Sequence, residues 1–206
     1  MSTRVIPARE WRDALDLLVN GEIVAIPTDT VYGIAAMPLD VNAIDAIYAA
    51  KDRPVDKALP MLVATVSAAE RIADLSGPVH LLCDRFWPGP LTVVASSAAT
   101  FSSPATADDG TVALRMPALD LALLLIGATG GVLAVTSANR SGHPAATTAA
   151  GVLAQLDGRI AAVVDGGPSP GGSPSSVVRI MNGQLQLLRG GGISQSELER
   201  ALYTGP

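Results

Sequence analysis

The spacing of apolar residues near the start of the chain changes from helical to strand-like within a few positions. Apolar side chains in residues 11–18 recur at i, i+3, i+4 and i+7, which predicts an amphipathic helix, and Gly21 follows as its expected C-terminal cap. Residues 23–26 are a short β-rich run that ends at Pro27, which predicts a buried strand. The chain therefore begins by alternating a helix with a strand.

A second helix is expected to begin after Asp40. Aspartate favours the N-cap position, and Val41, Ile44 and Tyr48 then share one predicted face. This helix should stop before Pro54, because the residue that precedes a proline disfavours helical backbone. Basic side chains follow at its predicted exit.

The central part of the chain repeats this alternation with shorter segments. A helix is predicted at residues 79–86, and Ser67 with Glu70 matches a capping box that would open another short helix. Residues 119–126 are apolar all round, so periodicity leaves a buried helix and a buried strand both open. Four strands are predicted, at residues 59–64, 91–95, 112–116 and 132–135.

After residue 140, polar residues and glycines indicate where the predicted elements begin and end. Thr147 or Thr148 is expected to cap a helix whose apolar face lies within residues 149–156. Residues 160–164 are β-branched and predict a strand, and residues 165–174 are a Gly/Pro/Ser loop.

The strongest local signal is a β-hairpin near the end of the chain. Residues 177–180 and 185–188 flank Asn182 and Gly183, a pair that favours a two-residue hairpin turn. Residues 194–197 match a second capping box and predict a terminal helix. Alternating helices and strands, together with this hairpin, predict an α/β fold with a mixed parallel and antiparallel sheet and flanking helices.

Length and composition agree with a single domain that spans residues 1–206. Apolar residues make up 49% of the chain, charged residues 16% and aromatic residues 3%, so the core must consist mainly of aliphatic side chains and alanine. The most apolar stretch, residues 121–128, is too short to span a bilayer, which argues against a membrane protein. The N-terminus has no apolar signal-like run and Cys83 is the single cysteine, so we expect a cytoplasmic location.

The common catalytic patterns are missing. We find no Walker A motif, dinucleotide-binding fingerprint, paired-cysteine motif or nucleophile elbow, and the two histidines are not clustered with other ligands, so a protein-held metal is not expected. His80 and Cys83 lie on what is predicted to be one apolar helix face, and both are interpreted as structural.

Four polar clusters interrupt or follow apolar strands: residues 27–33, 51–57, 136–142 and 165–176. The first is rich in turn formers and is as compatible with a simple turn as with ligand contacts, whereas the last is a Gly-rich loop, which by itself is more often a connector than a ligand site. The second holds three cations within seven residues of a chain with net charge −5, which favours binding of an anion such as a polyphosphate over a merely solvated loop. The third places small donors and an amide after a buried strand.

In order and spacing, these clusters resemble the motifs of the YrdC-like family of threonylcarbamoyl-AMP synthases. The resemblance covers residues 21–193 and is carried by GEIVAIPTDTVYGIAA, KDRPVDKALPMLV, FWPGPLTVV, VALRMP, TSANRSGHPAATT and SSVVRIMNGQLQLLRGG. It implies a twisted mixed sheet around a large concave cavity. It also implies an enzyme that joins L-threonine, bicarbonate and ATP into threonylcarbamoyl-AMP with release of pyrophosphate, for N6-threonylcarbamoyladenosine at position 37 of tRNA.

The same resemblance implies two sets of site residues. The positions that match threonine contacts are Thr30, Arg115, Ser137 and Ser175. The positions that match contacts with ATP or its phosphates are Lys51, Arg53, Lys57, Thr111, Asn139, Thr147 and Arg189, of which Lys51 and Arg53 are the expected catalytic pair.

Several positions depart from the common family pattern. Leu62 stands where some relatives have a histidine near the threonine, Ala58 where many have a proline, and Pro174 where a glutamate often precedes the last serine. The Arg189 segment reads Leu-Arg-Gly-Gly in place of Leu-Arg-Pro-Gly.

The predicted residue types suit this reaction. The amine of threonine captures carbon dioxide as an anionic carbamate, which must approach an anionic α-phosphate, and Lys51, Arg53 and Arg115 can offset that repulsion without a general base. We expect Mg²⁺ to arrive with ATP, held by phosphate oxygens and water. By the same resemblance, a separate tRNA threonylcarbamoyl-transferase complex takes the product, and contact with tRNA itself should be weak.

Two rival functions follow from the same pattern. One is the carbamoyl-adenylate chemistry of hydrogenase maturation factors, which resides in much longer chains with zinc-finger and acylphosphatase modules. The other is an RNA-binding module without chemistry, which the negative net charge disfavours. Conversion of ATP to AMP products without RNA discriminates between catalysis and RNA binding.

Overall fold

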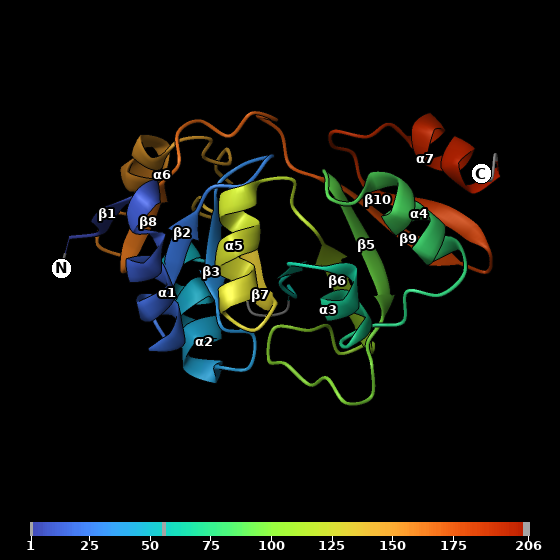
Figure 1. Cartoon of the computed structure of the whole chain (residues 1–206), viewed down its shortest axis with the longest axis horizontal. Helices are drawn as coiled ribbons and strands as arrows, with labels where there is room; N and C mark the ends of the chain where they lie inside the picture. The colour runs from blue at the N-terminus through green and yellow to red at the C-terminus, as the bar shows by residue number, and fades with distance from the viewer. Residues whose placement is uncertain (1, 55–56, 204–206) are drawn as a thin grey trace.

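The computed structural model describes residues 2–54 and 57–203, and within them ten strands form one mixed sheet (Figure 1). The strand order is β1-β8-β2-β3-β7-β4-β6-β5-β9-β10. Parallel pairs join β1 to β8, β2 to β8, β4 to β6 and β5 to β9, and the other neighbours are antiparallel. The predicted α/β fold with a mixed sheet is confirmed.

The first half of the sheet combines elements from residues 4–51 with elements from residues 120–165, and it lies on the left of Figure 1. Its strands are β1 (Arg4–Pro7), β2 (Val24–Ile26), β3 (Gly33–Ala36), β7 (Val132–Ser137) and β8 (Ala162–Asp165). Its helices are the 3₁₀ turn η1 (Ala8–Glu10), α1 (Trp11–Val19), α2 (Val41–Lys51), α5 (Asp120–Ala128) and α6 (Ala149–Leu156).

The second half of the sheet lies on the right of Figure 1 and ends in a hairpin. Its strands are β4 (Met61–Val63), β5 (Leu91–Ser96), β6 (Thr111–Arg115), β9 (Ser176–Met181) and β10 (Gln184–Arg189). Its helices are α3 (Val66–Glu70), α4 (Pro78–Phe86) and α7 (Gln195–Tyr203), of which α7 contacts α4.

Both faces of the sheet are covered, because side chains alternate between them along each strand. On one face Leu133 and Val135 belong to a core with Ala14 and Leu18 of α1 and with the buried side of α5. On the other face, residues such as Ile34, Met61 and Ala134 pack with Ile44 and Ile47 of α2 and Leu82 of α4. Residues that are paired across adjacent strands point to the same face of the sheet. Segments that are far apart in the sequence can therefore contribute side chains to one site.

Most of the predicted elements are confirmed. Asp40 caps α2 by accepting a hydrogen bond from the Ala43 amide at 3.1 Å, and Thr148 rather than Thr147 caps α6. The β9–β10 hairpin turns at Asn182 and Gly183, whose φ angles are 52° and 75°. Residues 119–126, for which the sequence allowed either a buried helix or a buried strand, form the N-cap and most of the helix α5.

Three details of the helix predictions are wrong. The N-cap of α3 is Thr65 and not Ser67, because Thr65 leaves β4 with extended backbone and its Oγ1 accepts a hydrogen bond from the Ala68 amide. Val41 is 56% exposed, since α2 turns Ile44 and Ile47 toward the core instead. Leu124 is also 56% exposed, so α5 is not buried all round.

His80 does not lie on the apolar face of α4. Leu82 and Cys83 occupy the buried side of this helix, whereas the His80 side chain is half exposed and lies 3.1 Å from the Asp84 carboxylate one turn later. The structural interpretation of Cys83 agrees with its full burial, which raises the pKa of its thiol to about 12, with a smaller contribution from nearby Asp84.

Candidate functional site

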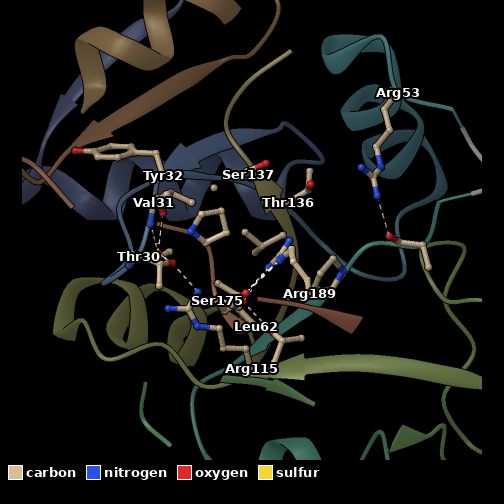
Figure 2. Close-up of a pocket in the computed structure, with 17 residues that line it drawn as sticks. Thr30, Val31, Tyr32, Arg53, Leu62, Arg115, Thr136, Ser137, Ser175 and Arg189 are labelled. Atoms are coloured by element: carbon tan, nitrogen blue, oxygen red, sulfur yellow. Dashed lines mark hydrogen bonds between the residues drawn. The ribbon is translucent and has the colours of Figure 1, made fainter. Parts of the chain in front are cut away.

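A pocket of about 230 Å³ opens where loops meet the strand ends near the middle of the sheet (Figure 2). All four residues predicted to contact threonine line it, and so do the predicted cations Arg53 and Arg189. The full lining is Thr28, Thr30, Val31, Tyr32, Gly33, Arg53, Ala58, Pro60, Leu62, Thr92, Arg115, Val135, Thr136, Ser137, Pro174, Ser175 and Arg189. The chain thus brings seven separated segments to one cavity.

Sheet register explains why several of these side chains face the same cavity. Leu62 of β4 is paired with Arg115 of β6, and Gly33 of β3 is paired with Ser137 of β7. Gly33 also provides space, because a Cβ there would lie 2.4 Å from Val135 Cγ1. The floor of the pocket therefore requires glycine at this point of the sheet.

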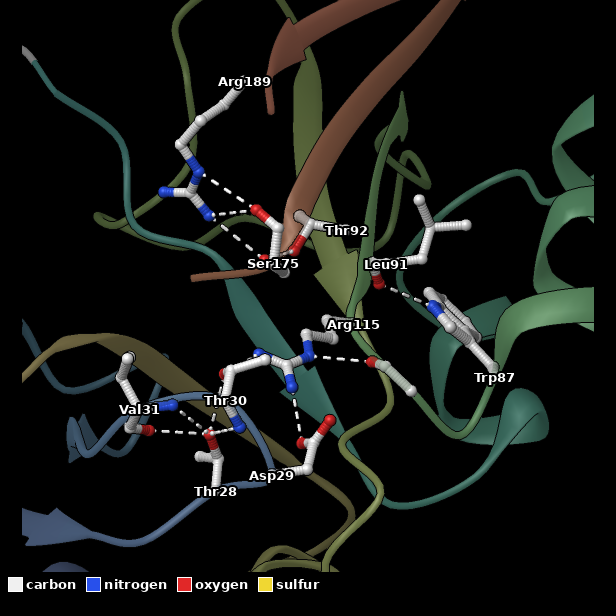
Figure 3. A network of polar contacts seen from close by, with 11 residues as sticks. Thr28, Asp29, Thr30, Val31, Trp87, Leu91, Thr92, Arg115, Ser175 and Arg189 are labelled. Carbon is white, nitrogen blue, oxygen red and sulfur yellow. Dashed lines mark hydrogen bonds and ion pairs between the residues drawn. The ribbon is translucent and has the colours of Figure 1, made fainter. Parts of the chain in front are cut away.

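Arg115 is 6% exposed, and three groups of the protein bind its guanidinium. Its Nε donates to the Gly89 carbonyl at 2.9 Å, its Nη1 donates to Thr30 Oγ1 at 2.7 Å, and its Nη2 pairs with the Asp29 carboxylate (Figure 3). Burial lowers the pKa of Arg115, nearby Asp29 opposes that shift, and repulsion from Arg189 adds to it. The guanidinium is therefore a fixed cation in the pocket wall.

The hydrogen bonds of the two hydroxyl groups beside Arg115 have a defined donor-to-acceptor direction. Thr28 Oγ1 donates to the Val31 carbonyl at 2.7 Å and lies 3.0 Å from Thr30 Oγ1. Because a hydroxyl has one proton, Thr30 must donate to Thr28, while it accepts from Arg115. Thr30 consequently offers a bound ligand a lone pair, the contact that an amine or hydroxyl donor needs.

Ser175 lies between the buried Arg115 and the more exposed Arg189, as both Figure 2 and Figure 3 show. Arg189 donates to the Ser175 carbonyl at 2.9 and 3.1 Å and to its Oγ at 3.1 Å. Thr92 Oγ1 is 2.7 Å from the same Oγ. This part of the pocket joins a hydroxyl to two positive charges, which suits an anionic oxygen.

Lys51 is placed differently from a surface cation at a helix end. It is 2% exposed and does not line the pocket, and its Nζ donates to the carbonyls of Ser137 and Asn139, the latter at 2.6 Å. Burial lowers its pKa from the usual 10.5 to about 8, with a further contribution from Arg53. Lys51 thus ties the end of α2 to the segment that carries Ser137.

Arg53 follows the end of α2 and lines the pocket (Figure 2). Its Nη2 donates to the carbonyls of Lys57 at 3.4 Å and Ala58 at 3.2 Å. Arg53 therefore binds the backbone of Lys57 and Ala58 and also brings a positive charge to the pocket rim. Lys57 itself is exposed and is not part of the lining.

Three further residues predicted to contact ATP lie outside the pocket lining. Asn139 is buried, and its Nδ2 donates to the carbonyls of Arg140 and His143, each at 2.8 Å, while its Oδ1 has no hydrogen-bond partner. Thr147 precedes α6 and accepts a hydrogen bond from the Ser169 amide through its carbonyl. Thr111 begins β6 and donates to Asp109.

Two lining residues, and one carboxylate behind the lining, were not predicted from the sequence. Thr28 and Thr92 lie within the quoted motifs but were not assigned, and Asp29, which holds Arg115, was treated as a turn former. A signal for Asp29 was present, since a carboxylate between two threonines needs a partner when the segment is buried. Nothing local to Thr92 indicates its partner, which is 83 residues away.

Within residues 2–54 and 57–203, no group of three or more His, Cys, Asp or Glu side chains is arranged to hold a metal ion. In the same part of the chain, no helix is both long and apolar enough to cross a bilayer.

Comparison with known proteins identifies the family. The Sua5/YciO/YrdC family model, described as "Telomere recombination", matches residues 16–191. The chain belongs to the Sua5/YciO/YrdC family. The family predicted from the sequence motifs is thereby confirmed.

Named relatives in this family share extensive identity with the chain. The Bacillus subtilis threonylcarbamoyl-AMP synthase is 43% identical over 194 residues, which are 92% of this chain and 55% of that protein. The Vibrio cholerae threonylcarbamoyl-AMP synthase is 32% identical over 186 residues, 87% of this chain and 96% of that protein. The chain therefore spans about half the length of the first relative and nearly all of the second.

A solved structure of the family matches the fold closely. The crystal structure of P. abyssi Sua5 complexed with L-threonine superposes with a TM-score of 0.91 at 36% identity, over 97% of this chain and 61% of that one. The Sua5/YciO/YrdC fold thus extends across nearly all of the chain.

Proposed function

We propose that this protein is a threonylcarbamoyl-AMP synthase, which joins L-threonine, bicarbonate and ATP into threonylcarbamoyl-AMP and releases pyrophosphate. The observation that carries the proposal is the convergence of Thr30, Arg115, Ser137 and Ser175 on one pocket with Arg53 at its rim. The names of the bacterial relatives and the L-threonine complex of P. abyssi Sua5 support the same activity.

The pocket suits an amino acid because it offers separate contacts for each end of the molecule. Thr30 presents a lone pair to a donor such as the amine. Arg115, Ser175 and Arg189 present positive charge and hydroxyl protons to a carboxylate. Leu62 and Val135 add apolar surface for a methyl group, although one methyl discriminates by only about 1–3 kcal/mol. Selection of threonine over serine is therefore expected to be modest.

The chemistry requires two anions to meet. Carbon dioxide from bicarbonate adds to the threonine amine, which loses a proton to water, to give a carbamate anion. A carbamate oxygen then attacks the α-phosphorus of ATP as the bond to the β-phosphate breaks and pyrophosphate leaves. Fixed positive charges that face the developing charge accelerate such a step without a general base. Arg53 is the cation at the rim, and it is the residue to which we assign this electrostatic role.

Lys51 acts from behind the pocket in this proposal. Its ammonium group is bound to the carbonyls of Ser137 and Asn139, so it fixes the segment that carries Ser137. The contacts predicted for Lys57, Thr111, Asn139 and Thr147 with ATP stay predictions. Mg²⁺ is proposed to enter with ATP, because it prefers phosphate oxygens and water to an all-protein cage.

The product is an activated adenylate, which a separate tRNA threonylcarbamoyl-transferase complex would consume. Weak contact with tRNA and a cytoplasmic location stay predictions from the sequence.

Product analysis tests the proposal. Incubation with ATP, L-threonine and ¹³C-bicarbonate should give an adenylate that carries one ¹³C atom and one threonine, seen by mass spectrometry without any RNA present. An adenylate formed from carbamoyl phosphate instead would favour the carbamoyl-transfer alternative. Absence of any AMP product without RNA would favour the RNA-binding alternative.

A further inference from the structure

The segment between α4 and β5 is hydrogen-bonded to two strands that carry or adjoin pocket residues, β6 and β9. The Gly89 carbonyl accepts a hydrogen bond from Arg115 Nε at 2.9 Å, and the Pro90 carbonyl accepts one from the Ser176 amide at 3.0 Å. Trp87 closes the turn by donating from Nε1 to the Leu91 carbonyl at 2.8 Å (Figure 3). This segment is the FWPGPLTVV motif, to which the proposed function assigns no role.

Thr92 is the side chain of this motif that reaches the pocket. It is 3% exposed, it lines the cavity, and its Oγ1 lies 2.7 Å from Ser175 Oγ. Among the described residues, the hydrogen bonds of the structure give Thr92 Oγ1 no other partner. Its hydroxyl is therefore committed to Ser175.

Either oxygen could donate in the hydrogen bond between Thr92 and Ser175, and the second lone pair of Ser175 allows Thr92 to be the donor. Ser175 Oγ has two lone pairs and one proton, and Arg189 already donates to one lone pair. When Thr92 donates to the other, both lone pairs are occupied and the Ser175 proton has to find an acceptor in the pocket. Two donations into one oxygen, one of them from a cation, also strengthen that oxygen's own O–H as a donor.

The surroundings favour an anionic acceptor. Ser175 lies between Arg115 and Arg189, and the repulsion that these guanidinium groups exert on each other marks the space between them as electropositive. Among the described residues, Asp29 is the only carboxylate bound to either arginine, and it contacts Arg115 on the side away from Ser175 (Figure 3).

We propose that Thr92 is a positioning residue that donates to Ser175 and thereby directs the Ser175 proton toward a carboxylate oxygen of the bound amino acid. The proposal rests on the proposed function, in which Ser175 contacts L-threonine. Thr92 acts through Ser175 and does not itself touch the substrate.

Calorimetric binding of L-threonine to the full chain tests this role. Thr92→Val removes the donor but keeps shape and β-branching, and should weaken binding about 10- to 100-fold, the effect of a lost hydrogen bond to a charged group. Thr92→Ser keeps the hydroxyl and should remain within about fourfold of wild type, since it lacks one methyl. Thr129→Val is the matched control, because Thr129 Oγ1 donates to the Ile126 carbonyl at the end of α5, outside the pocket.

A double variant separates positioning from general stabilisation. Thr92→Val combined with Ser175→Ala should bind L-threonine no more weakly than Ser175→Ala alone, because Thr92 acts only through Ser175. Additive losses, or wild-type affinity in Thr92→Val, would overturn the inference and leave the proposed function standing. If Thr92→Val does not fold, Thr92→Ala takes its place in the cycle. Failure of the wild-type protein to bind L-threonine would contradict the proposed function itself, and the inference with it.

Discussion

At the scale of single residues, Lys51 illustrates how burial changes the behaviour of a charged group. Its ammonium is surrounded by protein and bound to two carbonyls, so its charged form is tolerated but less favourable than in water. The sequence places this lysine at a helix end, where an exposed cation is the usual expectation. Its partners Ser137 and Asn139 lie 86 and 88 residues away, so no local pattern could predict the burial.

We predict that Lys51 titrates near pH 8. Burial lowers its pKa first and Arg53 second, so Arg53→Ala should raise the midpoint. The chain contains only two lysines, Lys51 and Lys57, so ¹³Cε resonances followed by NMR can be assigned with Lys57→Arg. A midpoint near the usual 10.5 would contradict this account of Lys51.

The same shift makes stability depend on pH. Between about pH 8 and 10.5 the unfolded chain binds more protons at Lys51 than the folded chain does, so the free energy of unfolding contributed by this group rises with pH across that window. Comparison with Lys51→Met isolates the effect from other titrating groups.

Arg53 provides the clearest residue-scale test of electrostatic catalysis. If its charge stabilises the meeting of carbamate and α-phosphate, Arg53→Ala should lower kcat by about 10²–10³-fold and change ATP affinity less. Arg53→Lys should restore only part of the rate, because lysine keeps the charge but loses the planar fork that also holds the Lys57 and Ala58 carbonyls. Steady-state kinetics at saturating substrates would refute the role if Arg53→Ala remained as active as wild type.

At the scale of elements, the hairpin β9–β10 shows how local and distant requirements combine. Its turn was predictable, since Asn182 and Gly183 adopt the left-handed conformation that such turns require. The course of the chain after the hairpin was not predictable, because the three glycines after Arg189 look equivalent in the sequence. In the structure they differ: a Cβ on Gly191 would lie 2.3 Å from the Ser176 amide nitrogen and 2.4 Å from the Pro174 carbonyl oxygen, whereas Gly190 has open space.

This difference gives a matched pair of variants. Gly191→Ala should push the Pro174–Ser176 backbone away and displace Ser175, lowering kcat/KM for L-threonine by about 10²-fold, as misplacement of about 1 Å can do. Gly190→Ala should leave kcat/KM unchanged. Equal activity of the two variants, with thermal unfolding confirming that both fold, would mean that the close approach of Gly191 does not position Ser175.

The elements that were mispredicted share a physical cause. Ser67 and Thr65 both satisfy the chemistry of an N-cap, and only the point at which β4 ends decides between them. Likewise, His80 and Leu82 are close in sequence on α4, and packing against the sheet selects which side is buried. Side-chain chemistry predicted that these helices exist, but their rotation depends on contacts with distant strands.

At the scale of the whole molecule, the sheet order determines the site. Strands β3, β7, β4 and β6 are neighbours although they come from widely separated parts of the chain, and this order brings Gly33, Ser137, Leu62 and Arg115 onto one face. Periodicity predicts the strands but not their order, which is why the grouping of site residues came from resemblance to a family. In the structure the four residues predicted to contact threonine line one pocket with Arg53 and Arg189, while five other predicted residues lie outside its lining, namely Lys51, Lys57, Thr111, Asn139 and Thr147. The contacts of all these residues with threonine or ATP stay predictions.

The central claim, that this pocket forms threonylcarbamoyl-AMP, is tested most directly by pyrophosphate release with each substrate omitted in turn. The account predicts release only when ATP, L-threonine and bicarbonate are all present, because the carbamate that attacks ATP cannot form without the latter two. Equal release after rigorous removal of bicarbonate, or in the absence of threonine, would contradict it.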